Sequence, residues 1–249
     1  MSSFDDRFAF AAGAYATYRP RYPAALFDWL RRRLPDARRV WDCGTGNGQA
    51  ASSLAERFEL VVATDASLAQ LAHADHANTP RYVAMTAEAC ALRTHSLDLV
   101  TVAQALHWFH RGAFFDEVRR VLAPGGLIAI WSYGIPTVGP AIDDVLRHFH
   151  DVEVGPFWSP ARRLVESGYR GVELPFIEEP TPLFEMEASW TLAQLGGYLS
   201  TWSAVGKYRA MNARDPVPQV MHALGERWGG LESVRPVRWP LTLRVGSSR

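Results

Sequence analysis

Three glycines at alternate positions, Gly44, Gly46 and Gly48, constrain the fold of this chain more than any other feature. They follow the short run VWDC (40–43), and a helix-forming stretch begins at Gln49. Glycine loses more conformational freedom on folding than any other residue, so such a stretch has to serve a tight turn or a ligand that approaches the backbone closely. The pattern predicts a loop between a buried strand and a helix, with backbone N–H groups that point to a ligand.

Short β-rich runs alternate with helical periods through the first half of the chain. Runs such as LIAIW (127–131) are continuously apolar, which indicates strands buried on both faces. The alternation predicts an α/β fold, with a doubly wound, mostly parallel sheet between two layers of helices. The expected strands are 39–43, 60–65, 81–86, 97–104 and 127–134, and the expected helices are 48–58, 67–77 and 113–122.

The flanking segments are less regular. Further helices are expected at 24–34, 141–152, 161–169, 191–211 and 218–228, and further strands at 183–190 and 237–248. Pro240 confines the last strand to an edge or a bulge. Residues 191–233 lie between two late strands, so we expect a helical excursion that caps the site.

We therefore divide the chain into three parts. We expect residues 1–37 to form an N-terminal helical lid and residues 38–135 to form the ligand-binding core. Residues 136–249 complete the sheet and carry the cap.

Composition limits the partners and the compartment. Lysine plus arginine and aspartate plus glutamate number 26 each, which argues against a nucleic-acid partner. No stretch approaches the roughly 20 apolar residues of a membrane span, and the N-terminus lacks the pattern of a signal peptide. Cys43 and Cys90 fit neither a disulfide framework nor a zinc site. We expect a reduced, cytoplasmic protein without a metal, and a monomer or homodimer.

The residues around the glycine loop discriminate between ligands. The dinucleotide fingerprint G-x-G-x-x-G would need a glycine at Gln49, and no Gly-Lys-Ser/Thr follows for a phosphate loop. Asp42 ends the strand, where a carboxylate would repel a pyrophosphate but suit a cationic ligand. Asp65 ends the next strand, about where Rossmann-type sites place an acid on ribose hydroxyls. The pattern indicates a nucleoside without phosphates, such as S-adenosylmethionine.

DCGTGNGQ (42–49) resembles the first motif of the class I, seven-stranded S-adenosylmethionine-dependent methyltransferases. The resemblance covers roughly residues 38–135. FAAGAYATYRPRYP (10–23) and AQALHWF (103–109) are similar to segments that recur together in the small-molecule branch that includes trans-aconitate methyltransferases. The resemblance implies a Rossmann-like sheet of seven strands, S-adenosylmethionine as the cofactor and a small-molecule methyl acceptor.

The resemblance also implies cofactor contacts, which group by the part of the cofactor that they would touch. They are Asp42, Gly44 and Gly46 for the methionine moiety; Asp65 for the ribose; Ala66, Ala87 and Glu88 for the adenine; Gln104 and Ala105 beneath the sulfonium; and Tyr15, Tyr18 and Arg19 in the lid, with Arg19 pairing the cofactor's carboxylate. Structural roles remain open for several of them. Glu88 could be a solvated loop acid, and Arg19 could serve only the extended entry to the helix at 24–34.

The acceptor site is expected beyond the fourth strand. His107 and Trp108 either contact the acceptor or pack the carboxyl edge of the sheet, and His107 is the candidate general base. In the expected cap, Trp202 and Tyr208 either face the acceptor or form core. Lys207 and Arg209 are the cations expected to hold a polyacid there.

We expect in-line transfer of a methyl group. If the nucleophile is a carboxylate, as the resemblance to trans-aconitate methyltransferases implies, it is ionised at neutral pH and needs no base. A phenol or an amine would make a base such as His107 useful. Two alternatives stay open: a nicotinamide-dependent oxidoreductase, and a non-catalytic module that binds S-adenosylmethionine.

Overall fold

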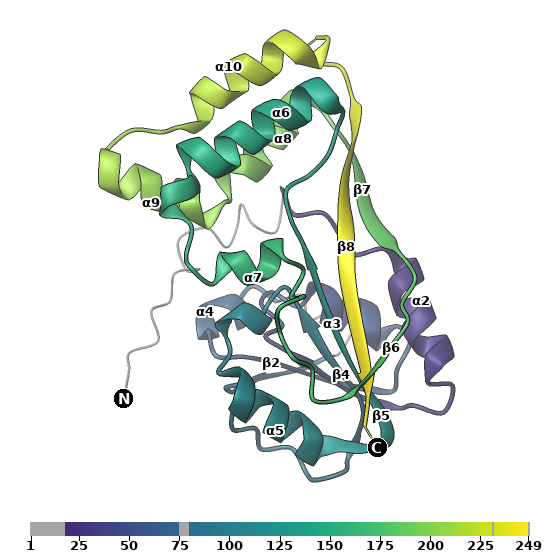
Figure 1. The fold of residues 1–249 in the computed structure, drawn as a ribbon. Helices are drawn as coiled ribbons and strands as arrows, with labels where there is room; N and C mark the ends of the chain where they lie inside the picture. The colour runs from purple at the N-terminus through teal and green to yellow at the C-terminus, as the bar shows by residue number, and fades with distance from the viewer. Residues whose placement is uncertain (1–17, 75–79, 231, 249) are drawn as a thin grey trace.

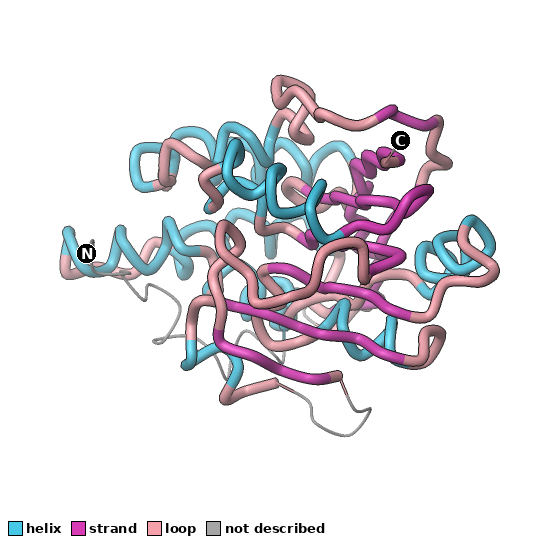
Figure 2. The backbone as a smooth tube through the Cα atoms, turned by 90° about the horizontal axis from the view of Figure 1, so that it is seen from below, coloured by secondary structure: helices cyan, strands magenta, loops and turns pink. Residues whose placement is uncertain are grey.

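The computed structural model describes residues 18–74, 80–230 and 232–248, and its centre is one eight-stranded sheet (Figure 1). The strand order is β3-β2-β1-β4-β5-β8-β6, and β7 also pairs with β8. The strands are β1 (Arg39–Cys43), β2 (Leu60–Asp65), β3 (Arg81–Ala84), β4 (Leu97–Ala103), β5 (Leu122–Tyr133), β6 (Ile177–Glu179), β7 (Phe184–Trp190) and β8 (Arg235–Ser247). In Figure 2 they run side by side as one layer.

The first five strands are mutually parallel, and β8 runs antiparallel to β5. The doubly wound, mostly parallel sheet is therefore confirmed. β1 pairs with β2 on one side and with β4 on the other, so the strand order reverses between β1 and β4. In open α/β sheets the carboxyl ends of the two strands at such a switch point flank the ligand crevice.

The sheet has eight strands where seven were expected, because two short strands share one edge. β6 pairs with residues 245–247 of β8, and β7 pairs with residues 235–241. Pro180 and Pro182 lie between β6 and β7. Proline cannot donate to a ladder, so a single continuous edge strand is interrupted here.

Pro240 was predicted to confine the last strand to an edge or a bulge; β8 is an interior strand, so the edge was wrong, but the pairing beside Pro240 is irregular, as at a bulge. β8 pairs with β5 only from Leu241 onward, and the next contact on that side is the bridge between Arg238 and Thr137. Pro240 falls between these two contacts, and it pairs with Glu185 of β7 on the other side. The missing N–H therefore costs no ladder bond to β5.

The helices occupy the predicted places with some changes of length. They are α2 (Ala24–Arg33), α3 (Gln49–Ala55), α4 (Leu68–Leu71), α5 (Arg111–Val121), α6 (Pro140–His148), α7 (Arg162–Glu166), α8 (Leu192–Ser200), α9 (Ser203–Asn212) and α10 (Val217–Trp228), with single turns η1 (Leu106–Trp108), η2 (Phe149–Glu153) and η3 (Gly155–Phe157). The helix expected at 191–211 is two helices that meet near Trp202. The one expected at 161–169 ends early, since Gly168 and Tyr169 have positive φ angles of 59°.

Alternate residues of the central strands β1 and β4 point into two separate cores. Val40 and Leu99 belong to the core that α2 and α3 cover, whereas Trp41 and Val100 belong to the core that α5 covers. This is the two-sided burial that the continuously apolar strands predicted. α6, α8, α9 and α10 gather beyond the end of the sheet toward which β5 runs (Figure 1).

α8, α9 and α10 lie between β7 and β8 in the chain, as the excursion at 191–233 predicted. No helix in the described part of the chain combines the length and apolar character that crossing a bilayer requires.

Candidate functional site

The loops that follow β1 and β4 touch at the switch point. Gly44, Gly46 and Gly48 all have positive φ angles, of 69°, 58° and 86°. A Cβ on Gly44 would lie 2.6 Å from the Cβ of Ala105, and one on Gly48 would lie 2.2 Å from the Tyr82 hydroxyl. Around Gly46, however, the nearest atom would be 3.7 Å away. The outer two glycines thus serve contacts within the protein, and Gly46 keeps the backbone open.

Asp42 supports this loop from inside the sheet. Its side chain is fully buried, and both carboxylate oxygens accept hydrogen bonds of 2.6 Å, from the hydroxyls of Thr45 and Thr101. Burial raises the pKa of the carboxyl to about 6, although the two threonine bonds act in the opposite direction. Asp42 binds the hydroxyl of Thr45, which belongs to the glycine loop. This differs from the direct contact with the methionine moiety that we expected of Asp42.

Asp65 bridges the glycine loop and the next turn. One carboxylate oxygen accepts a 2.8 Å hydrogen bond from the N–H of Gly46, and the other accepts one of 2.8 Å from the N–H of Ser67. Asp65 is half-buried and Ala66 is exposed. Each carboxylate oxygen can accept more than one hydrogen bond, so Asp65 can bind ribose hydroxyls without leaving the loop.

Gln104 and Ala105 form the floor between β4 and β5. Gln104 has a positive φ of 58°, which is uncommon for a residue with a side chain. Its amide donates to the carbonyl of Tyr133 at 2.9 Å and accepts from the N–H of the same residue at 3.1 Å. The side chain therefore joins the ends of β4 and β5, and Ala105 is turned against Gly44.

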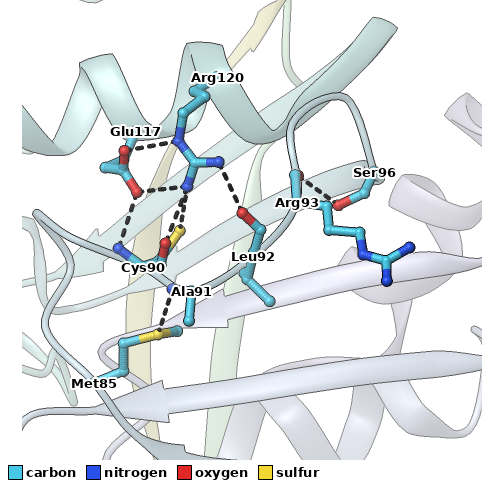
Figure 3. A network of polar contacts seen from close by, with 8 residues as sticks. All are labelled: Met85, Cys90, Ala91, Leu92, Arg93, Ser96, Glu117 and Arg120. Carbon is cyan, nitrogen blue, oxygen red and sulfur yellow. Dashed lines mark hydrogen bonds and ion pairs between the residues drawn. The ribbon is translucent and has the colours of Figure 1, made fainter.

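The segment between β3 and β4 is held by α5 at both ends of that helix. Glu88 accepts a 2.8 Å hydrogen bond from the N–H of His110, which precedes α5. Figure 3 shows the other end, where Glu117 accepts from the N–H of Cys90 at 2.9 Å and Arg120 donates to the carbonyls of Cys90 and Leu92. Arg120 also pairs with Glu117 and lowers the pKa of that carboxyl to about 2. Ala87 is buried beside this network.

The N-terminal segment reaches the cap and the end of β5. The Tyr18 ring packs on Gly197 of α8, where an added Cβ would lie 2.5 Å from it. Arg19 donates to the Tyr133 hydroxyl at 3.1 Å, and its guanidinium carbon lies 5.2 Å from the Tyr198 ring centroid. Tyr15 lies outside the described residues.

His107 is half-buried, and it is uncharged at neutral pH. Its Nδ1 shares a 3.0 Å hydrogen bond with the hydroxyl of Tyr169, and its ring lies 4.6 Å from that of Trp108. Burial, with a smaller contribution from the positive charge of Arg162, lowers the pKa of His107 to about 3. Burial also raises the pKa of Tyr169, so both groups are neutral at pH 7. Trp108, by contrast, is 45% exposed.

The four residues expected in the cap take different places. Trp202 contacts the interior of the cap, where it is buried among the rings of Phe149, His150, Trp158 and Tyr198. Tyr208 packs on Phe157 of η3, with 5.0 Å between ring centroids. Arg209 donates to Asp215 at 2.8 Å, and Lys207 is half-buried on the same helix. Of the two cations that the sequence suggested for a polyacid, Arg209 is therefore already paired with Asp215.

Sequence analysis missed several residues that the fold brings near His107 and Arg19. They are Tyr133, Arg162, Tyr169 and Tyr198. Tyr133 carried a usable signal, because it ends the fifth expected strand at the carboxyl edge of the sheet. The others lie in the irregular second half, where no local pattern marks their burial.

Comparisons with known proteins show which family this chain resembles. The family model described as a methyltransferase domain matches residues 41–130. A solved structure from Anaeromyxobacter dehalogenans, named as a type II methyltransferase, is similar with a TM-score of 0.85 and 40% identity, over 92% of this chain and 98% of that chain. A Dictyostelium discoideum protein named as a methyltransferase is 28% identical over 227 residues, which are 90% of this chain and 86% of the relative.

A third relative matches over a shorter length. The malonyl-[acyl-carrier protein] O-methyltransferase of a Marinomonas species is 34% identical over 131 residues. This match covers 49% of this chain and 48% of the relative, so this chain matches about half the length of that protein.

Proposed function

Because this chain belongs to the class I S-adenosylmethionine-dependent methyltransferases and takes S-adenosylmethionine as its cofactor, we propose that it methylates a carboxylate oxygen of a small acid. Family membership excludes one alternative that the sequence left open, the function of a nicotinamide-dependent oxidoreductase. The name of the Marinomonas relative describes transfer to oxygen, which agrees with the proposed acceptor atom.

The residues at the switch point fit this cofactor. Gly46 leaves space beside the backbone, and Asp65 presents a half-buried carboxylate next to it. We assign the methionine part to Gly44 and Gly46, the ribose hydroxyls to Asp65, and the adenine to Ala87 and Glu88. When bound, the cofactor supplies a methyl group that its sulfonium already activates.

The choice of acceptor depends on the surroundings of His107, whose Nδ1 shares a hydrogen bond with the Tyr169 hydroxyl and whose burial lowers its pKa. With a pKa of about 3, its ring has little tendency to take a proton at neutral pH, although a useful base has a pKa near the working pH. A phenol or an amine has to lose a proton to be methylated. A carboxylate is already ionised, so it needs no base. His107 then serves as an uncharged wall that Tyr169 holds in place.

The charges near this wall also favour an anionic acceptor. The charge of Arg162 acts on His107, and Arg19, between Tyr133 and Tyr198, stays assigned to the cofactor's carboxylate. Positive charge near the wall would favour an anionic acceptor, and the aromatic rings would exclude water. In well-oriented model reactions, positioning alone contributes about 7–11 kcal/mol.

The test is transfer of labelled methyl from S-adenosylmethionine to a panel of acids, phenols and amines. We expect transfer to trans-aconitate, citrate or succinate, and a product from which alkali releases labelled methanol, since methyl esters hydrolyse in alkali and methyl ethers and amines do not. Transfer to a phenol or an amine alone, giving an alkali-stable product, would refute carboxylate methylation. Transfer to no member of the panel, with the cofactor bound, would refute it as well and favour a non-catalytic module.

A further inference from the structure

Arg162 is a half-buried cation with a loose ion pair. Its side chain is only 18% exposed, and its guanidinium carbon lies 4.7 Å from the centroid of the Trp158 ring. The nearest carboxylate oxygen belongs to Glu166, 3.6 Å from Nε, which is longer than a hydrogen bond. Within the described residues, this buried Nε has no hydrogen-bond partner.

Holding a guanidinium in this environment costs folding free energy. Its buried Nε–H has lost water, and a charge removed from water is stabilised only by good pairing and good hydrogen bonds. Buried polar atoms in native proteins nearly always have a partner, so an exception asks for an explanation such as a ligand. The neighbouring Arg163, in contrast, is exposed.

The position of Arg162 connects the carboxyl edge of the sheet with the cap. α7 packs against η1, which holds His107, and Tyr169, three residues after α7, bonds the His107 ring. On the other side Trp158, which supports the guanidinium, packs on Trp202 with 5.6 Å between ring centroids. The charge of Arg162 therefore lies between the loop after β4 and the aromatic interior of the cap.

We propose that Arg162 binds a carboxylate of the methyl acceptor and so selects polyacids. This inference rests on the proposed function and identifies the cation of its acceptor site. A guanidinium matches a carboxylate with two parallel hydrogen bonds, and the Trp158 face fixes its plane. Glu166 is near enough to orient the guanidinium and too far to take its Nε–H.

The test compares Arg162→Gln and Arg162→Lys with the matched control Arg163→Gln. Each variant, saturated with S-adenosylhomocysteine, is titrated with trans-aconitate and with citrate by calorimetry, and KM is measured for the best-methylated acid. Arg162→Gln should weaken acid binding and raise KM about 10- to 100-fold, the usual effect of losing a charged hydrogen bond. Arg162→Lys should restore part of the loss, because it returns the charge without the fork.

Arg163→Gln should leave acid binding unchanged, and all three variants should keep the parent's affinity for S-adenosylhomocysteine. Retained cofactor affinity also shows that a variant is folded. The inference is overturned if Arg162→Gln binds and methylates acids as Arg163→Gln does. If acids bind in an Arg162-dependent way but none is methylated, the proposed function fails and the assignment of Arg162 stands.

Discussion

Replacing Asp42 with asparagine should remove one component of the pH dependence of folding. In the folded protein burial raises the pKa of this fully buried carboxyl from its ordinary 3.8 to about 6. A raised pKa means that the folded state holds the proton more tightly than the unfolded state. The stabilising contribution is therefore complete below pH 3.8 and is lost as the pH rises through 6. A shift of about two units corresponds to about 3 kcal/mol, at 1.36 kcal/mol per unit.

The assay is urea unfolding of the parent and of Asp42→Asn at intervals between pH 4 and pH 7. The parent should lose about 2–2.5 kcal/mol of unfolding free energy relative to the variant over this range. Asp36→Asn, at an exposed acid between α2 and β1, controls for the removal of one negative charge. A difference between parent and Asp42→Asn that stays constant with pH would refute the reasoning, because the carboxyl would then not be forced to ionise in a buried site.

Three further substitutions test the cofactor site. Asp65→Ala should weaken S-adenosylhomocysteine about 10- to 100-fold in calorimetry, since the ribose hydroxyls lose a charged acceptor; unchanged affinity would show that the acid is misassigned. In urea unfolding, Gly44→Ala should destabilise the protein by about 1–3 kcal/mol more than the control Gly125→Ala. Both glycines have positive φ, but only a Cβ on Gly44 would meet Ala105, at 2.6 Å. Equal losses would contradict the close approach of the two loops. Glu117→Gln should raise KM for S-adenosylmethionine and leave KM for the acid unchanged, since it loosens the segment that holds Ala87 and Glu88; a change in the acid's KM alone would contradict this role.

The core of the fold was predictable because its signals are local. Strands such as LIAIW (127–131) are continuous apolar runs, and the glycines at 44, 46 and 48 mark a turn whose backbone needs positive φ angles. Pro240 predicted an edge strand because its missing N–H would cost a ladder hydrogen bond in an interior strand. Whether that bond is lost depends on where the neighbouring strand stops pairing. That point is set by the bridge to Thr137, about a hundred positions away in the chain.

The acceptor side of the site was less predictable, because burial there is decided by tertiary packing. Arg162 and Arg163 are adjacent and chemically identical, yet only Arg162 lies on Trp158. The helical spacing of Trp202 fits a substrate-facing residue and a core residue equally well. The aromatic rings that surround it come from elsewhere in the chain. Asp42 was placed correctly in its strand, but its partner Thr101 comes from β4.

A crystal structure with S-adenosylhomocysteine and trans-aconitate would test the central claim most directly. We predict the homocysteine moiety along Gly44 and Gly46, the ribose on Asp65, and a carboxylate of the acid on the guanidinium of Arg162. Cofactor density away from the glycine loop, or an acid bound without contact to Arg162, would contradict the account.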